Sequence, residues 1–126
     1  MEKIELTVGQ IVMAARVFNA EKFKEMQLPM KVSLWIVKNG GITAEVVRLF
    51  SQNRAKVFET FAEETISDKP EKYIPDNKLG EYEEEVKKML AEKIEIEYSL
   101  IPAKALESVM ITPKELFAVI YAIAED

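Results

Sequence analysis

Residues 93–98 read Lys93-Ile94-Glu95-Ile96-Glu97-Tyr98, so that charged and apolar side chains alternate. Near the N-terminus, Lys3-Ile4-Glu5-Leu6-Thr7 alternates in the same way. Successive side chains point to opposite faces of a β-strand, so each segment predicts a strand with one apolar face. Neither strand can satisfy its backbone groups alone. We therefore predict that strands near 2–7 and 93–99 pair with each other and cover a helical core.

Helical patterns account for most of the remaining chain. Thr7 and Gln10 form a capping-box pattern ahead of a first helix, and Thr112, Pro113 and Glu115 give the last helix a similar start. Apolar residues recur at helical spacing at Ile11, Ala14, Ala15 and Phe18, at Val46, Val47, Phe50, Val57, Phe58 and Phe61, and at Leu79, Tyr82, Val86, Met89 and Leu90. The sequence thus predicts a predominantly helical α+β fold with four or five helices and a small two-stranded sheet.

The middle of the chain predicts two separate helices. Pro29 suits the first turn of a short helix that carries Val32, Trp35 and Ile36. Asn39-Gly40-Gly41 is expected to end that helix, because these residues tolerate the left-handed conformation found at helix ends. Thr43 then caps a longer helix that runs to about Glu64.

The chain of 126 residues fits a single domain, 1–126. Residues 66–78 contain Ser67-Asp68-Lys69-Pro70 and Pro75-Asp76-Asn77, which are typical of turns, and they predict a polar linker inside that domain. Ala103 to Met110 is expected to form a short turn or helix.

The chain has no histidine and no cysteine. This composition removes the imidazole base, the thiolate nucleophile and the usual ligands of zinc. The sequence also lacks a calcium-binding loop pattern and a glycine-rich phosphate loop. We therefore expect no enzyme, no catalytic residue, no metal site and no cofactor, although a carboxylate-dependent enzyme stays open as a remote alternative.

The net charge is −5, from 22 acidic and 17 basic residues. No run of Lys or Arg is longer than two residues, which argues against a nucleic-acid-binding surface. The N-terminus does not resemble a signal peptide, and no apolar stretch approaches the roughly 20 residues of a membrane span. The expectation is a soluble protein with neither a nucleic acid nor a membrane as partner.

Two residues of the middle helices are candidate contacts for a partner or ligand. Arg54 interrupts the apolar stripe of the long helix. Its guanidinium either reaches water or a carboxylate at the edge of the core, or lies in a cleft that binds an anion. Trp35 is the only tryptophan and lies among Leu34, Ile36 and Val37, so it is either buried in the core or exposed for a partner.

The last helix supplies the other two candidates, Phe117 and Tyr121. Residues 116–124 are apolar on nearly all sides of a helix. Such a helix is buried on most of its surface, either within its own domain or in a subunit interface. The sequence leaves these two alternatives open.

Several short segments resemble a family of small proteins of phages and prophages of Gram-positive bacteria, to which no function is assigned. The resemblance lies in Ile4-Glu5-Leu6-Thr7-Val8-Gly9-Gln10-Ile11, Leu28-Pro29-Met30-Lys31-Val32-Ser33, Phe50-x-x-x-Arg54-x-Lys56-Val57-Phe58-Glu59-x-Phe61, Ile94-Glu95-Ile96-Glu97, Ile101-Pro102 and Ile111-Thr112-Pro113-x-x-Leu116. The chain departs from the family at Asn39-Gly40-Gly41, where the family is similar to one continuous helix or a plain helical hairpin. The resemblance implies a viral origin and gives no catalytic residues.

These observations predict a non-enzymatic phage protein that binds another phage or host protein during infection or assembly, with a homo-oligomer as a further expectation. Its expected location is the host bacterial cytoplasm or the virion. The alternative is a counter-defence protein that inhibits a host immune enzyme or sequesters a small anionic nucleotide signal.

Overall fold

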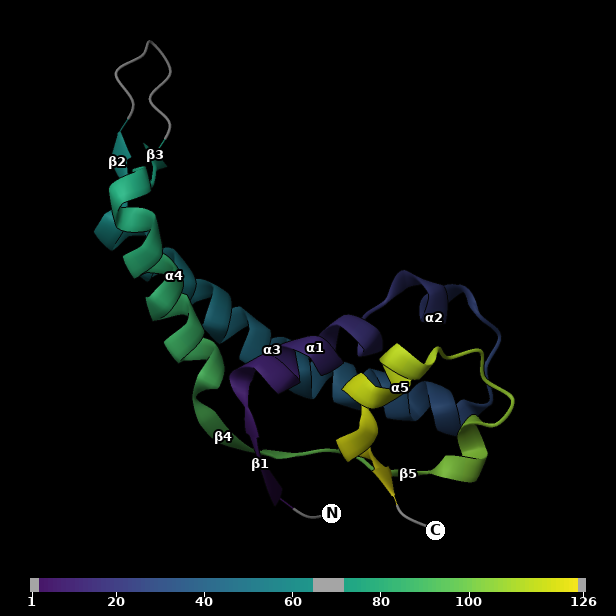
Figure 1. The fold of residues 1–126 in the computed structure, drawn as a ribbon. Helices are drawn as coiled ribbons and strands as arrows, with labels where there is room; N and C mark the ends of the chain where they lie inside the picture. The colour runs from purple at the N-terminus through teal and green to yellow at the C-terminus, as the bar shows by residue number, and fades with distance from the viewer. Residues whose placement is uncertain (1–2, 65–71, 125–126) are drawn as a thin grey trace.

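The computed structural model describes residues 3–64 and 72–124, and helices make up most of it (Figure 1). The elements, in chain order, are β1 (Lys3–Thr7), α1 (Val8–Phe18), α2 (Glu21–Glu25), α3 (Met30–Phe61), β2 (Glu63–Glu64), β3 (Lys72–Tyr73), α4 (Asp76–Ala91), β4 (Lys93–Glu97), β5 (Ile101–Pro102), the 3-10 helix η1 (Ala103–Leu106), α5 (Pro113–Ala118), the 3-10 helix η2 (Ile120–Ala122) and β6 (Ile123–Ala124). The predicted helical α+β class is confirmed, and so is the short helix after Pro102.

Strands β1 and β4 pair with each other, as their alternating sequences predicted, and the structure shows that the pairing is antiparallel. Ile4 lies opposite Ile96 and Leu6 opposite Ile94, which places apolar side chains together on one face. Leu6 and Ile96 are buried in the hydrophobic core. The charged residues of both strands point to the other face, so the sheet covers the helices with its apolar side.

Helix α3 differs most from the sequence prediction. It runs without interruption from Met30 to Phe61, through the Asn39-Gly40-Gly41 segment that was expected to end a helix. Neither of these glycines has a positive φ, so neither adopts the left-handed conformation of a helix end. Thr43 therefore lies inside α3 and does not cap a helix. The N-cap residue of α3 is Pro29. The predicted short helix and its break are wrong.

Tertiary contacts explain why this segment stays helical. Asn39 is fully buried, and its side-chain amide donates to the Ser99 carbonyl and accepts from the Ser99 amide, each at 2.9 Å. Gly40 lies against the end of α1, where an added Cβ would be 3.1 Å from Asn19 Oδ1. The Thr43 hydroxyl donates to the Asn39 carbonyl at 2.7 Å. The polar and small residues of this segment thus contact other elements of the fold and do not end the helix.

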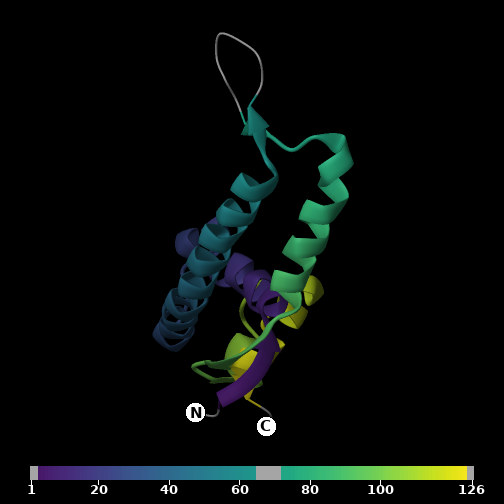
Figure 2. The same cartoon turned by 90° about the vertical axis from the view of Figure 1, so that its left-hand side faces the viewer.

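The second half of α3 and helix α4 form an arm that extends away from the other helices (Figures 1 and 2). Phe58 of α3 and Tyr82 of α4 meet edge to face, with ring centroids 6.1 Å apart. The structure describes all of α4, and none of its residues is buried. The arm is therefore held by half-buried side chains along one stripe of each helix.

The predicted linker at 66–78 lies only partly within the described residues, because 66–71 fall outside them. Lys72–Tyr73 forms β3, which pairs antiparallel with β2, and α4 begins at Asp76. The described part of that segment is therefore a strand followed by the start of a helix. Because β2 comes directly after α3, the long helix ends at Phe61 and not near Glu64.

The core lies where α1 crosses the first half of α3. Ile11, Phe18 and Val32 are buried there together with Trp35. The rings of Phe18 and Trp35 meet edge to face at 5.1 Å between centroids, an arrangement that aromatic pairs favour. The Trp35 Nε1 donates to the Ala122 carbonyl at 2.9 Å, which joins α3 to the C-terminal segment.

The C-terminal segment begins as predicted and then departs from the prediction. Thr112 caps α5 with a complete capping box, and Pro113 is the first helical residue. The helix ends at Ala118, however, and η2 and β6 follow, so a single helix over 116–124 is wrong. Strand β6 pairs in parallel with β5, and this pairing lets the segment bury Val119 and Ala122 while its backbone leaves the helical path.

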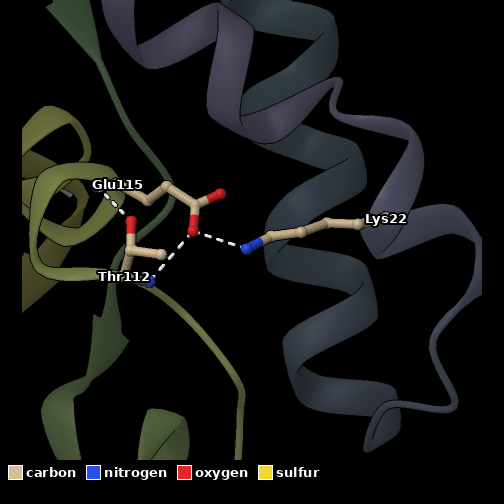
Figure 3. A network of polar contacts seen from close by, with 3 residues as sticks. All are labelled: Lys22, Thr112 and Glu115. Carbon is tan, nitrogen blue, oxygen red and sulfur yellow. Dashed lines mark hydrogen bonds and ion pairs between the residues drawn. The ribbon is translucent and has the colours of Figure 1, made fainter.

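An ion pair fixes the start of α5 against α2 (Figure 3). Lys22 Nζ lies 2.5 Å from Glu115 Oε1, and the same carboxylate accepts a hydrogen bond from the Thr112 amide. Burial raises the pKa of the Glu115 carboxyl, but the bonds from Lys22 and Thr112 outweigh this effect and hold the pKa below its usual value. The N3 residue of the capping box thus also links two elements distant in sequence.

Candidate functional site

Two candidate residues of the C-terminal segment are exposed. Phe117, on α5, keeps 73% of its surface accessible, and Tyr121, in η2, keeps 49%. The neighbouring Val119 and Ala122 point into the core and are buried. The exposure of Phe117 and Tyr121 follows from this orientation, because one face of the segment serves the core and the aromatic residues lie on the other.

These aromatic side chains border a groove of about 50 Å³. We call it the aromatic groove, and it is lined by Leu6, Gln10, Met13, Tyr98, Phe117, Ala118 and Tyr121. Its lining comes from β1, α1, α5 and η2, together with Tyr98, which follows β4. Met13 is 43% exposed, so three large side chains that usually seek burial are accessible around one hollow.

Tyr98 belongs to the lining of this groove and is only 2% exposed. Its hydroxyl is buried and makes no hydrogen bond with any residue that the structure describes. Burial raises the pKa of Tyr98 to about 12, because the charged phenolate would lose its hydration. A buried tyrosine hydroxyl normally has a partner, so an unpaired one is unusual in the interior.

Trp35, the third candidate, lies in the core and donates its indole N–H to the Ala122 carbonyl. In this conformation its ring is not accessible to a partner. The core alternative therefore describes Trp35, and the exposed positions nearby on α3 are Leu34 and Val37.

Arg54, the fourth candidate, is exposed on the arm half of α3. Its guanidinium carbon lies 5.5 Å from the centroid of the Phe50 ring, and it forms no ion pair with any described residue. The first alternative placed its guanidinium in water or beside a carboxylate; no carboxylate of 3–64 or 72–124 pairs with it, and the side chain is exposed. Arg54 also lines a cleft, as the second alternative requires, so both alternatives stay open.

The cleft beside Arg54 has a volume of about 320 Å³ and lies between α1 and α3. We call it the arginine cleft, and it is lined by Val12, Ala15, Arg16, Asn19, Ala44, Val47, Phe50, Ser51 and Arg54. The structure thus brings Arg54 together with Arg16, a residue 38 positions earlier in the chain. Phe117 and Tyr121 do not line the arginine cleft, and Arg54 does not line the aromatic groove.

Several lining residues were not predicted from the sequence, and the most informative of them are Arg16, Met13 and Tyr98. Val12, Arg16 and Asn19 recur at helical spacing beside the buried face of α1, and this second stripe was a usable signal for Arg16. Tyr98 continues the alternation of its strand onto the buried face. Met13 carried no signal, because a single exposed methionine on a helix is ordinary.

The described linings of the two hollows contain no acidic residue. Across the described ranges, no group of three or more acidic residues comes close enough to hold a metal ion. No helix in the described part of the chain combines the length and apolarity required to cross a membrane. The two sites instead offer an apolar surface and a pair of cations.

No family model matches the sequence, and no curated protein and no solved structure is significantly similar to it. The resemblance to phage proteins therefore stays a prediction.

Proposed function

We propose that this protein acts without chemistry of its own, by binding another protein at the aromatic groove. The observation that carries this proposal is the exposure of Phe117 and Tyr121 beside Met13 around one hollow. Aromatic residues and methionine are enriched in protein interfaces, and large aromatic side chains often supply most of the binding energy. Covering them with a partner would remove apolar surface from water.

The size of the groove favours a protein partner over a small molecule. Small-molecule pockets commonly have volumes of roughly 300–1,000 Å³, whereas the aromatic groove has about 50 Å³. A hollow of this size suits one projecting apolar side chain of a partner. Phe117 and Tyr121 would then pack around that anchor from the rim, and neutral Gln10 would stay at the edge.

The partner is a different phage or host protein, met in the cytoplasm of the host during infection or assembly. This setting follows from the resemblance to phage proteins, and a second copy of the chain is the competing occupant. The two partners differ in one measurable property. Self-association would make the mass of the purified protein depend on its concentration, whereas a separate partner would leave it monomeric.

The test is capture of partners from phage-infected cells with the tagged wild-type protein and with a Phe117→Ser/Tyr121→Ser variant. We expect one protein to bind the wild type and not the variant. Binding of that protein, once purified, should weaken at least about tenfold in the variant, because two large contact side chains are lost. The variant should melt at the wild-type temperature, because both residues are exposed.

Met30→Ser is the matched control, because Met30 is as exposed as Phe117 and lies outside the groove. It should retain the partner with unchanged affinity. Equal binding by the groove variant and the wild type would contradict the proposal. A concentration-dependent dimer that the groove variant abolishes would assign the surface to a second copy instead.

A further inference from the structure

The arginine cleft is separate from the aromatic groove and has a different chemistry. Its lining contributes two guanidinium groups, those of Arg16 on α1 and Arg54 on α3. Neither arginine forms an ion pair with any residue in 3–64 or 72–124. Among the described residues that line the cleft there is no carboxylate.

This arrangement is notable in a chain whose net charge is −5. The third described arginine, Arg48, pairs with Glu45 one helical turn away. Two arginines that form no ion pair with a described residue thus bring positive charge to one hollow of an acidic protein. Such charge attracts anions, and the planar guanidinium group suits the oxygens of a phosphate or carboxylate.

The remaining lining indicates what else the ligand carries. Val12, Val47 and Phe50 are apolar, while Asn19 and Ser51 add polar groups. The volume of about 320 Å³ falls at the lower end of the range for small-molecule sites. The acidic charge of the chain disfavours a long polyanion, because its distant phosphates would meet repulsion outside the cleft.

We propose that the arginine cleft binds a small phosphate-bearing molecule with a planar apolar part, such as a nucleotide. The phosphate lies between the guanidinium groups of Arg16 and Arg54, and the planar part packs on the apolar lining contributed by α1 and α3. Arg54 is positioned for this role because its guanidinium lies over the ring of Phe50. This site functions independently of protein binding at the aromatic groove.

The test measures binding of AMP to the full chain by titration calorimetry, with adenosine and a single-stranded DNA oligonucleotide as comparison ligands. We expect AMP to bind with a Kd below about 1 mM and adenosine at least about tenfold more weakly, because adenosine lacks the phosphate. The oligonucleotide should bind no more tightly than AMP. Each of Arg16→Ala and Arg54→Ala should weaken AMP binding by about tenfold or more.

Arg48→Ala is the matched control, since Arg48 is exposed on the same helix and lies outside the cleft. It should leave AMP binding unchanged. Arg54→Lys keeps the charge and loses the planar group, so its AMP affinity should fall between those of the wild type and Arg54→Ala. The wild-type melting temperature in each variant would show that folding is intact.

The proposal would be overturned by the absence of AMP binding at several times the expected Kd, by equal affinity for AMP and adenosine, or by an Arg48→Ala effect as large as that of Arg16→Ala. Tighter binding of the oligonucleotide than of AMP would likewise overturn it, in favour of a nucleic-acid surface.

Discussion

The two adjacent glycines of α3 allow a sharp test of the continuous helix. Gly40 and Gly41 are both helical, but their surroundings differ. A Cβ added at Gly41 would meet nothing within 4 Å, whereas one added at Gly40 would lie 3.1 Å from Asn19 Oδ1. We therefore expect Gly41→Ala and Gly40→Ala to change the free energy of unfolding in different directions.

The magnitudes follow from helix propensity and packing. Alanine is favoured over glycine in a helix interior by about 1 kcal/mol, so Gly41→Ala should stabilise the protein by roughly that amount. Gly40→Ala gains the same propensity, but Asn19 cannot move freely because its Nδ2 donates to the Ala15 carbonyl. Overpacking costs about 1–3 kcal/mol, so the net effect at Gly40 lies between about zero and a loss of 2 kcal/mol.

Urea denaturation followed by circular dichroism measures both effects, provided that the dependence on denaturant stays unchanged. The two variants should differ by about 1–3 kcal/mol, with Gly41→Ala above the wild type. Asn19→Ala supplies a further control, because Gly40→Ala should become more favourable once the obstructing amide is gone. Destabilisation by Gly41→Ala equal to or larger than that by Gly40→Ala would refute a continuous helix, since alanine resists the left-handed conformation of a helix end.

Two further predictions concern buried polar groups. Asn39→Ala should lower the free energy of unfolding by about 2–4 kcal/mol, because it leaves both backbone groups of Ser99 without their partner. Denaturation experiments measure this loss, and Asn53→Ala, at an exposed position, should change the free energy of unfolding far less. Tyr98→Phe should leave the melting temperature equal or higher near neutral pH, because the lost hydroxyl makes no hydrogen bond with a described residue. Between pH 10 and about 12 the native state holds the Tyr98 proton more strongly than the unfolded chain, so wild-type stability should fall with rising pH by up to about 3 kcal/mol. The Tyr98→Phe variant should not show this part of the loss of stability at alkaline pH. Identical profiles of stability against pH for the variant and the wild type would contradict the raised pKa of Tyr98.

Local patterns predicted the parts of the fold that local physics controls. The capping boxes at Thr7 and Thr112 and the alternation in β1 and β4 depend on neighbours within a few residues, and all were confirmed. Asn39-Gly40-Gly41 has the local chemistry of a helix end, but its role depends on contacts with Asn19 and Ser99. Asn19 lies 21 residues before Gly40 and Ser99 lies 60 residues after Asn39, beyond the reach of a single-sequence pattern.

The same distinction applies to the candidate sites. Phe117 and Tyr121 could be selected because they lie in a segment with more apolar surface than a small domain can bury. Their orientation depends on the pairing of β6 with β5. The two-residue strand Ile123–Ala124 is too short for its sequence to predict this pairing. Arg54 could be selected because it interrupts a stripe. The second stripe of α1 could indicate Arg16, but that Arg16 and Arg54 line the same cleft depends on how α1 packs against α3.

The hydrogen bond between Trp35 and the Ala122 carbonyl gives the molecule a natural fluorescent reporter. Because this is the only tryptophan, its emission reports on the junction between the first half of α3 and the C-terminal segment, and on nothing in the arm. Circular dichroism, in contrast, receives a large contribution from the arm helices. Comparing the two signals during unfolding therefore separates the arm from the core without any added label. Coincident curves would mean that half-buried stripes suffice to make α4 fold cooperatively with the core, and an earlier loss of dichroism would identify the arm as an independent unit.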